Sequence, residues 1–426
     1  MGMRARHIVA LGFAASLAAT WADRALGQAP GAGGVTVFEG ARAIVGDGRP
    51  PIENAALVVT GGRIGEIGRN GQVRVPAGAA RVNLAGKTVM PAIVDTHTHL
   101  SDTREGLTDD LRRRAYYGIG AVMSLGQDRG ALPFQMRAQL IPGAARFFTA
   151  GRGITTPEPG RSDAPYWVTT EAEARKALQE LAASKVDIVK IWVDDRDGKY
   201  KKMSPELYRA VIDEAHARGL RVTAHIFTLE DAKGLLRAGI DAFAHGIRDR
   251  DIDDEAVALV KARPNVVLVP NLPDRGVKTD LGWLGDSIPS PQLRTLQEAA
   301  TDRPPLQALF AIQARNLARL SAAGVRIALG TDGNTPWAVH TEMADMVAAG
   351  MTPAQVLVAA TRNSAEFLRL ADAGTLETGK SADFVVLDAN PLDDITNTRR
   401  IASVYLRGAA VDRAAFRVSA TAPPNR

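Results

Sequence analysis

Short apolar runs alternate with amphipathic stretches through the middle of the chain. The apolar runs are rich in Val, Ile and Ala, and their length suits buried strands. One helix between them is well marked, because Ser204 is a favoured N-cap residue, Pro205 suits the first helical position and Gly219 follows the end. We predict eight strands, which end near Asp95, Ser124, Ala150, Ile191, His225, His245, Pro270 and Gly330.

This alternation predicts the fold class. Strands that alternate with helices favour a parallel sheet, and eight such units favour a closed (β/α)8 TIM barrel. The stretch between Asn271 and Leu320 is longer than a single crossover requires. We therefore expect an α/β protein whose barrel carries additional structure in that stretch.

The two ends of the chain have a different pattern. Between residues 35 and 90, short apolar or alternating runs are separated by turns at Gly61-Gly62, Asn70-Gly71 and Ala85-Gly86. Residues 383–387 and 401–406 return to this strand-like pattern. We predict a small composite β-sandwich domain formed by residues 28–91 and 372–426, and a hydrolase barrel over residues 92–371.

The first residues have the pattern of a secretory signal peptide. Arg4 and Arg6 precede an apolar run over residues 8–19, which is shorter than the roughly 20 residues of a membrane span. Residues 25–27, Ala-Leu-Gly, then give a small-x-small cleavage pattern before Gln28. We predict that residues 1–27 are removed on export, which leaves a periplasmic or secreted protein with no membrane attachment; an uncleaved anchor is the alternative.

Composition narrows the classes of function and of metal ligand. The 426 residues are 46% hydrophobic and 23% charged, as in ordinary globular proteins. The net charge of +5 falls to +3 when residues 1–27 are removed, and basic residues are interspersed with acidic ones, so no nucleic-acid partner is expected. The sequence contains no cysteine, so any metal must be held by imidazole and oxygen ligands.

Histidines gather at the predicted strand ends. His97 and His99 follow an apolar run, and residues two apart in an extended segment point to the same side. His225, His245 and Asp332 each follow a separate predicted strand. Because catalytic groups of a TIM barrel lie at the carboxyl ends of its strands, we predict one metal site from these five residues. A satisfied core or loop residue is the alternative for any one of them.

Lys190 lies inside an apolar predicted strand, residues 186–192. A charged amine there is costly unless it is paired, and nearby divalent cations would repel it. Carboxylation by carbon dioxide would convert the amine into a carbamate anion with two oxygens that can bridge two metals. An ion pair with Asp194 or Asp195 is the alternative.

Other side chains are candidates for substrate contacts or for ordinary packing. His216 is predicted to be a surface or packing residue, whereas His340 could contact substrate or be an ordinary loop histidine. Three aromatic residues could line an apolar pocket, and three arginines could bind a substrate carboxylate, with solvated surface charge as the alternative for each arginine. They are Trp192, Phe227 and Trp337, and Arg248, Arg250 and Arg275.

Two longer motifs resemble signatures of the amidohydrolase superfamily. Residues 89–99 read VMPAIVDTHTH and resemble its first-strand signature, with Ala92 where glycine is usual; residues 374–383, GTLETGKSAD, resemble its C-terminal signature. Lys190, His225, His245 and Asp332 follow in the expected order. The chain is most similar in pattern to imidazolonepropionase-like and Xaa-Pro dipeptidase-like amidohydrolases, and the likeness extends over essentially all of the predicted mature chain.

The resemblance implies a binuclear site and a reaction. His97, His99 and Asp332 would hold a deeper divalent metal, His225 and His245 an outer one, and carboxylated Lys190 would bridge both; zinc is the expected metal. The implied enzyme cleaves an amide C–N bond of a small molecule, such as a dipeptide or an N-acyl amino acid. A metal-bridging hydroxide would attack the carbonyl, with Asp332 as the general base.

Two alternatives stay open at the level of sequence. The same binuclear site could act on a cyclic amide, a lactone or a phosphotriester. The protein could instead be a non-catalytic metal-binding protein, although the presence of Asp332 argues against a site that lacks its base. Homo-oligomerisation also stays open.

Overall fold

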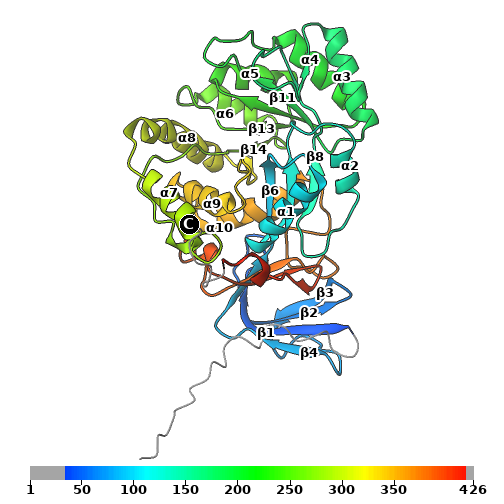
Figure 1. The fold of residues 1–426 in the computed structure, drawn as a ribbon, viewed down its shortest axis with the longest axis vertical. Coiled ribbons are helices and arrows are strands. Elements are labelled where there is room, and N and C mark those ends of the chain that lie inside the picture. The colour runs from blue at the N-terminus through cyan, green and yellow to red at the C-terminus, as the bar shows by residue number, and fades with distance from the viewer. Residues whose placement is uncertain (1–33, 419–426) are drawn as a thin grey trace, which may run out of the picture.

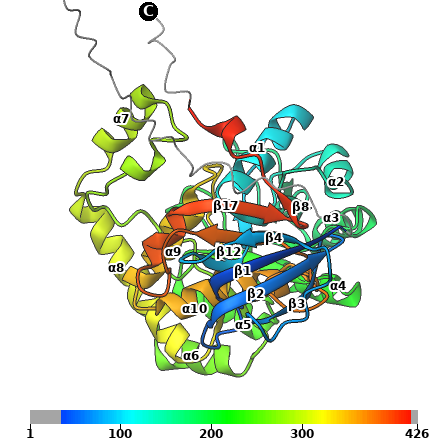
Figure 2. The same ribbon diagram turned by 90° about the horizontal axis from the view of Figure 1, so that it is seen from below.

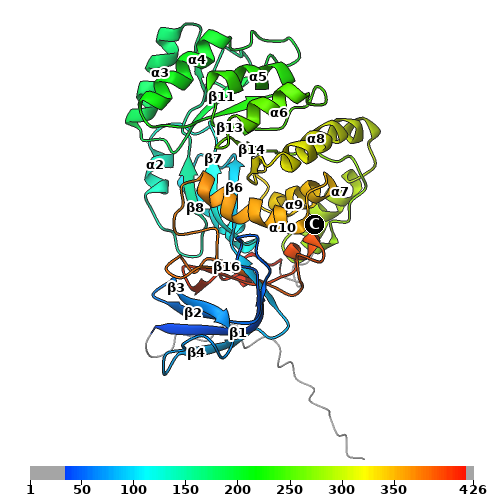
Figure 3. The ribbon, with the colours of Figure 1, turned by 180° about the vertical axis from the view of Figure 1, so that it is seen from behind.

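The computed structural model describes residues 34–418, so the predicted signal peptide over residues 1–27 lies outside the described residues. One end of the molecule is a sheet that contains the blue strands β1–β4, and the other end carries the helices α3–α6 around parallel strands (Figure 1). The view from behind places β16 between these two parts (Figure 3). None of the helices in residues 34–418 has both the length and the apolar character needed to cross a membrane.

The first sheet combines strands from both ends of the described chain. Its order is β18-β17-β16-β5-β1-β2-β3, and β4 pairs with β1. The strands β16 and β5 are antiparallel, with Val385 opposite Met90. Through this pairing β17, from late in the chain, belongs to the same sheet as β1, β2 and β3 (Figure 2). The aromatic rings of Phe38, Phe384 and Tyr405 pack together inside this part, with centroids 4.7 to 5.0 Å apart. The predicted joining of the two ends is observed, and the predicted sandwich form and domain limits stay predictions.

The bounds of these strands are β1 Val35–Ala43, β2 Ile52–Thr60, β3 Arg63–Arg69, β4 Ala80–Asn83, β5 Thr88–Pro91, β16 Phe384–Leu387, β17 Ile401–Leu406 and β18 Ala409–Ala410.

The α/β part is built from parallel strands. One group pairs in the order β6-β7-β8 and the other in the order β10-β9-β11-β12-β13-β14-β15. Backbone hydrogen bonds connect the groups on both sides, for example from Asp187 N to Thr149 O at 3.1 Å and from Thr96 N to Leu329 O at 3.0 Å. The α/β class with parallel strands is confirmed, and full closure into an eight-stranded barrel stays a prediction.

The strands of this part are β6 Ile93–Thr98, β7 Ile119–Ser124, β8 Arg146–Thr149, β9 Ile154–Thr155, β10 Tyr166–Trp167, β11 Val189–Val193, β12 Val222–Ile226, β13 Ala242–Ala244, β14 Val267–Val269 and β15 Arg326–Ile327.

The helices follow from local signals in the sequence. In α4, the Ser204 hydroxyl accepts a hydrogen bond from Leu207 N and Pro205 occupies the first turn, as predicted. The long stretch after Asn271 contains a short 3-10 helix and α7, and it continues into α8. The helices are α1 Arg104–Tyr116, α2 Leu132–Arg137, α3 Glu171–Ala183, α4 Pro205–Ala217, α5 Leu229–Ala238, α6 Asp254–Lys261, α7 Ser290–Ala299, α8 Pro304–Ala322, α9 Ala338–Ala348, α10 Pro353–Val358 and α11 Ser364–Phe367.

One apolar run crosses from one sheet to the other. Residues 89–94 form the end of β5 and the start of β6, and the break lies at Ala92, whose N–H donates to Asp383 O. His97 follows this run but lies within β6, because the strand continues to Thr98 rather than ending near Asp95 as predicted. The apolar period alone does not reveal this change of sheet, since both strands are buried.

Candidate metal centre

His97 and His99 come from the end of β6 and point toward the same carboxylate. Their Nε2 atoms lie 2.9 Å and 3.0 Å from Oδ1 of Asp332, and their ring centroids are 5.4 Å apart. His97 is 1% exposed, whereas the Asp332 side chain is 37% exposed. The alternating side-chain directions of an extended strand thus bring both imidazoles to one point, as predicted.

Asp332 and His245 reach this point from two other strand ends. Asp332 follows β15 and its N–H donates to His97 O at 2.7 Å, while His245 follows β13 and its Nε2 lies 3.5 Å from Asp332 Oδ2. Both residues have positive φ angles, 53° for Asp332 and 154° for His245. Residues other than glycine rarely adopt positive φ angles, and those that do are often found at functional sites.

Gly330 allows the segment between β15 and Asp332 to approach β6. A Cβ atom at this position would lie 2.6 Å from a methyl group of Val269 and 2.8 Å from the Cβ of His97. Any larger residue would therefore push these neighbours apart. The glycine before Thr331 and Asp332 is a requirement of close packing at the centre.

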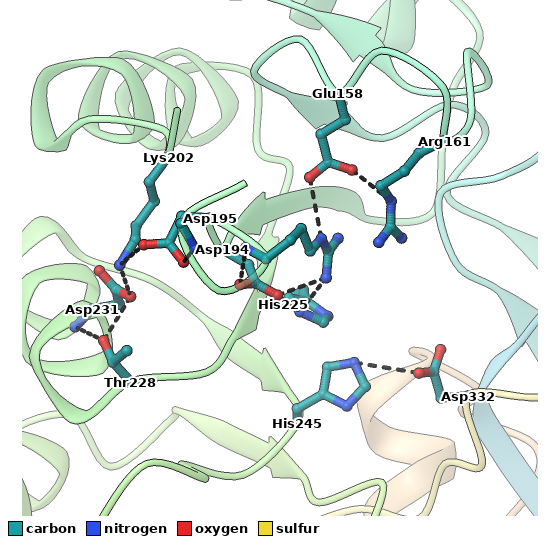
Figure 4. A network of polar contacts seen from close by, with 12 residues as sticks. Glu158, Arg161, Asp194, Asp195, Lys202, His225, Thr228, Asp231, His245 and Asp332 are labelled. Carbon is teal, nitrogen blue, oxygen red and sulfur yellow. Dashed lines mark hydrogen bonds and ion pairs between the residues drawn. The ribbon is translucent and has the colours of Figure 1, made fainter. Parts of the chain in front are cut away.

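His225 lies at the end of β12 beside His245, with ring centroids 4.5 Å apart. Its Nε2 is 2.9 Å from Asp194 Oδ2, and Asp194 also accepts from Arg196 at 2.6 Å (Figure 4). Arg196 continues this network to Glu158, at 3.2 Å. The imidazole of His225 is therefore held by Asp194 and not by Asp332.

Lys190 lies within β11 and is fully buried, and its Nζ has no hydrogen-bond partner among residues 34–418. Asp194 is engaged by His225 and Arg196, and the nearest cation to Asp195 is Lys202, at 3.6 Å. The alternative of an ion pair between Lys190 and either aspartate is therefore wrong. The side chain of Asp194 turns toward the histidine instead.

The electrostatics of the centre follow from burial and from neighbouring charges. Burial alone would raise the pKa of Asp332, but the facing histidines, His97 above all, hold it well below its ordinary range. Burial and the positive charge of Lys190 lower the pKa of His97 to about 4. Burial lowers the pKa of Lys190 to about 7. These shifts favour a carboxylate, neutral imidazoles and a substantial fraction of neutral amine near pH 7.

The residues present suit divalent metal ions. Ligand atoms of His97, His245 and Asp332 all lie within 4.8 Å of one another. His97 Nδ1 is 3.0 Å from Asn271 Oδ1, which leaves Nε2 toward Asp332, and Asp194 occupies His225 Nε2, which leaves Nδ1. Such outer hydrogen bonds orient metal-binding imidazoles. Nitrogen and oxygen donors of this kind suit zinc and related ions.

Several contributors were missed from the sequence. The sequence pattern does not single out Asn271 or Glu158 as members of the site. It indicates Asp194 only as a partner of Lys190. Asp194 follows the last residue of β11, and Asn271 lies two residues after β14. The rule that functional side chains follow strand ends would have found both.

The remaining two histidines of the described chain lie outside the centre. His340 is buried in α9, with Nε2 3.0 Å from Tyr117 O and Nδ1 3.1 Å from Thr398 Oγ1. The prediction of a loop or substrate-contacting histidine is therefore wrong, because the helix turns its ring into the core. His216, near the end of α4, is 40% exposed and lies 2.9 Å from Asp241 Oδ2, as expected of a surface residue.

Comparison with known proteins identifies the family. The model of the amidohydrolase family matches residues 88–411, which include every predicted ligand. The chain belongs to the amidohydrolase family. This amidohydrolase is 28% identical over 389 residues to the imidazolonepropionase of Deinococcus radiodurans, which covers 84% of this chain and 92% of that protein.

Two solved structures extend the comparison. A protein of Bifidobacterium longum described as a candidate prolidase has a TM-score of 0.74 and 29% identity, over 89% of this chain and 95% of that one. A Xaa-Pro dipeptidase with bound methionine in its active site has a TM-score of 0.71 at 22% identity, over 88% and 99% of the two chains, which supports the fold alone. The predicted superfamily is confirmed, and this amidohydrolase is a hydrolase of that family.

Proposed function

We propose that this amidohydrolase cleaves the amide C–N bond of a small substrate such as a dipeptide or an N-acyl amino acid. The observation that carries the proposal is the convergence of His97, His99 and His245 on Asp332. The imidazolonepropionase and the candidate prolidase, similar over most of this chain, support this reaction class.

The proposed ligand set has two halves. His97, His99 and Asp332 would hold one divalent ion, expected to be zinc, and His225 with His245 would hold a second. Carboxylated Lys190 would lie between them, which is supported by its buried amine without a hydrogen-bond partner in the described chain. When bound, such ions lower the pKa of a coordinated water and polarise a carbonyl group.

Asp332 has the position of a general base. Its side chain is 37% exposed, whereas His97 and His245 beside it are buried, so substrate and water can reach the carboxylate. Its carboxylate can accept a proton from the attacking water and then deliver that proton to the leaving amine. Asp194 and Asn271 act on the imidazoles of His225 and His97 by fixing their orientation.

The test is to measure metal content and amide hydrolysis on purified protein that begins at Gln28. A panel of dipeptides and N-acyl amino acids is assayed before and after chelation, with zinc added back as the control. We expect about two metals per chain and cleavage that is lost on chelation and restored by zinc. Full metal content without cleavage of any amide would contradict the proposed reaction and direct the search to lactones, cyclic amides and phosphotriesters.

We further propose that the protein is exported and that residues 1–27 are removed on export. The support is the order of Arg4 and Arg6, the apolar run over residues 8–19 and the small residues before Gln28. N-terminal sequencing of protein from the host's extracytoplasmic fraction should begin at Gln28. Recovery of an uncleaved, membrane-bound chain would support the anchor instead.

A further inference from the structure

Arg248 lies at the same edge of the α/β part as the predicted metal ligands. It follows His245 by three residues, and its backbone N–H donates to Phe227 O at 2.9 Å. Phe227 in turn directly follows β12 and lies two residues after His225. The hydrogen bond therefore ties together the loops that follow the two strands carrying His225 and His245.

Two nitrogens of the Arg248 guanidinium are buried and lack hydrogen-bond partners among residues 34–418. Its Cζ lies 5.7 Å from the centroid of the Phe227 ring, and its Nε and Nη2 atoms are buried without a partner in the described chain. It is the one arginine within residues 34–418 with two such nitrogens. Nε and Nη2 form the side edge of the planar group, whose parallel N–H bonds match the two oxygens of a carboxylate.

Neighbouring arginines do not share this property. Arg196 contacts both Asp194 and Glu158. Arg250 lies 2.7 Å from Asp249, and Arg275 lies 3.0 Å from Asp345. These three guanidinium groups are already neutralised by carboxylates, so Arg248 is the candidate that retains donors for an external anion.

The negative charges that act on Arg248 belong to residues of the centre. Burial lowers the pKa of Arg248, and the carboxylates of Asp332 and Asp194 oppose this shift. Both carboxylates already contact the histidines of the site. An arginine remains charged in proteins, and a buried guanidinium without hydrogen bonds is costly. Nε and Nη2 of Arg248 are therefore suited to bind an anion with two oxygens.

We propose that Arg248 binds a carboxylate of the substrate through Nε and Nη2, and so selects anionic amides such as N-acyl amino acids and peptides with a free C-terminus. Neutral cyclic amides, lactones and phosphotriesters lack the group that this edge recognises. The inference rests on the proposed function for the identity of the scissile bond. The recognition of the carboxylate can be measured without turnover.

The test compares binding of acids with binding of their neutral counterparts. Calorimetry on the metal-loaded protein uses the N-methanesulfonyl derivatives of alanine, leucine and phenylalanine, which keep the α-carboxylate but have no scissile amide bond, each beside its α-carboxamide. At least one acid should bind tenfold or more tightly than its carboxamide. In Arg248→Gln, binding of that acid should weaken by roughly 30-fold or more, while binding of the carboxamide stays unchanged.

Two further variants make the result specific. Arg250→Gln removes an exposed, paired arginine two residues away and should leave the preference for the acid intact. Arg248→Lys keeps the charge but loses the paired donors, so acid binding should weaken while carboxamide binding does not; this variant decides the matter if Arg248→Gln does not fold. Circular dichroism checks each fold.

The outcomes separate this inference from the proposed function. An acid preference that survives in both Arg248 variants, or its absence from the wild type, overturns the role of Arg248. Acid binding that depends on Arg248 without cleavage of any amide supports that role and contradicts the proposed reaction. Amide cleavage without an acid preference supports the reaction and overturns the role of Arg248.

Discussion

Asp332 shows how one residue can serve both a metal and a proton transfer. Three imidazoles face its two oxygens, from His97, His99 and His245. These contacts lower its pKa, so it is a carboxylate across the whole range in which the protein works. A carboxylate that is both held in place and partly exposed is suited to accept a proton in the reaction.

We predict that Asp332→Asn retains the fold but lowers kcat/KM by about 100-fold or more, because an amide cannot act as a base. Steady-state kinetics on the best substrate of the panel measures the loss, and metal analysis accompanies it. Asp195→Asn is the matched control, since Asp195 lies at the same edge and its side chain faces Lys202. Activity of Asp332→Asn within threefold of wild type would exclude Asp332 as the base.

Lys190 is a second residue whose burial destabilises the metal-free folded state, because the charged amine loses its hydration. Its pKa of about 7 in the folded chain is far below the 10.5 of an exposed lysine. Between these two values the unfolded chain binds more protons, so in the metal-free protein this residue makes stability rise with pH through that window. The cost is the desolvation of the amine.

We predict that Lys190→Met lowers metal content to at most one ion per chain, yet makes the metal-free protein more stable at pH 7. Thermal unfolding of chelated, carbon dioxide-free protein between pH 7 and 9 should show a flatter pH dependence than in wild type. Lys202→Met, which removes a half-exposed lysine paired with Asp231, should keep its metal. A metal-free Lys190→Met that is less stable than wild type would contradict this account.

At the scale of elements, α9 carries a buried acidic face. Glu342 accepts a hydrogen bond from Leu272 N at 3.1 Å, and Asp345 lies 3.0 Å from Arg275. Burial raises the pKa of Asp345 to about 7, and burial together with the charge of Asp345 raises the pKa of Glu342 well above its ordinary value. Between the ordinary pKa of a carboxyl group and the raised values, the folded state therefore binds more protons than the unfolded state. The free energy of unfolding falls as the pH rises through this range.

We predict that Glu342→Gln raises the melting temperature at pH 8 and changes it little at pH 5. At pH 8 the carboxyl group is ionised in the unfolded chain, whereas burial opposes its ionisation in the folded chain. The glutamine oxygen can still accept from Leu272 N, so the gain reflects the removal of a buried acid. Differential scanning calorimetry at the two pH values measures it. Glu298→Gln, on the exposed helix α7, should change neither value; an equal gain at both pH values would contradict the ionisation argument.

At the scale of the whole molecule, the predicted ligands come from five strands spread over much of the chain. Residues 97 and 332 meet although they are far apart in the sequence, and β15 reaches β6 through the bond from Thr96 N to Leu329 O. Metal bound to such a site stabilises the native state, because the unfolded chain does not keep the ligands together. The centre and the fold are therefore coupled.

We predict that chelation lowers the free energy of unfolding by about 3 kcal/mol for each metal site, relative to protein with free zinc at 100 times the dissociation constant of that site. Thermal unfolding with and without chelator measures this, and addition of zinc should restore the melting temperature. In Lys190→Met the shift should be smaller. An unchanged melting temperature would argue that the six residues do not bind metal in the native state.

The parts of this protein that depend on local pattern can be predicted from its amino-acid sequence. Strand–helix alternation, the capping of α4 and the two β-rich ends were predicted because periodicity and caps act over a few residues. The site residues were proposed for a related reason, since parallel strands end at one edge and each candidate follows a strand.

Tertiary structure decided which of those side chains meet. Asp194 turns to His225, and Lys190 has no hydrogen-bond partner among the described residues. His340 is turned into the core by α9. Of the candidate arginines, Arg248 is the one with two buried nitrogens that have no partner in the same part of the chain. These choices depend on strand register and on the loops between distant segments. A one-dimensional pattern does not contain them, because a side chain pairs with whatever lies nearest in space.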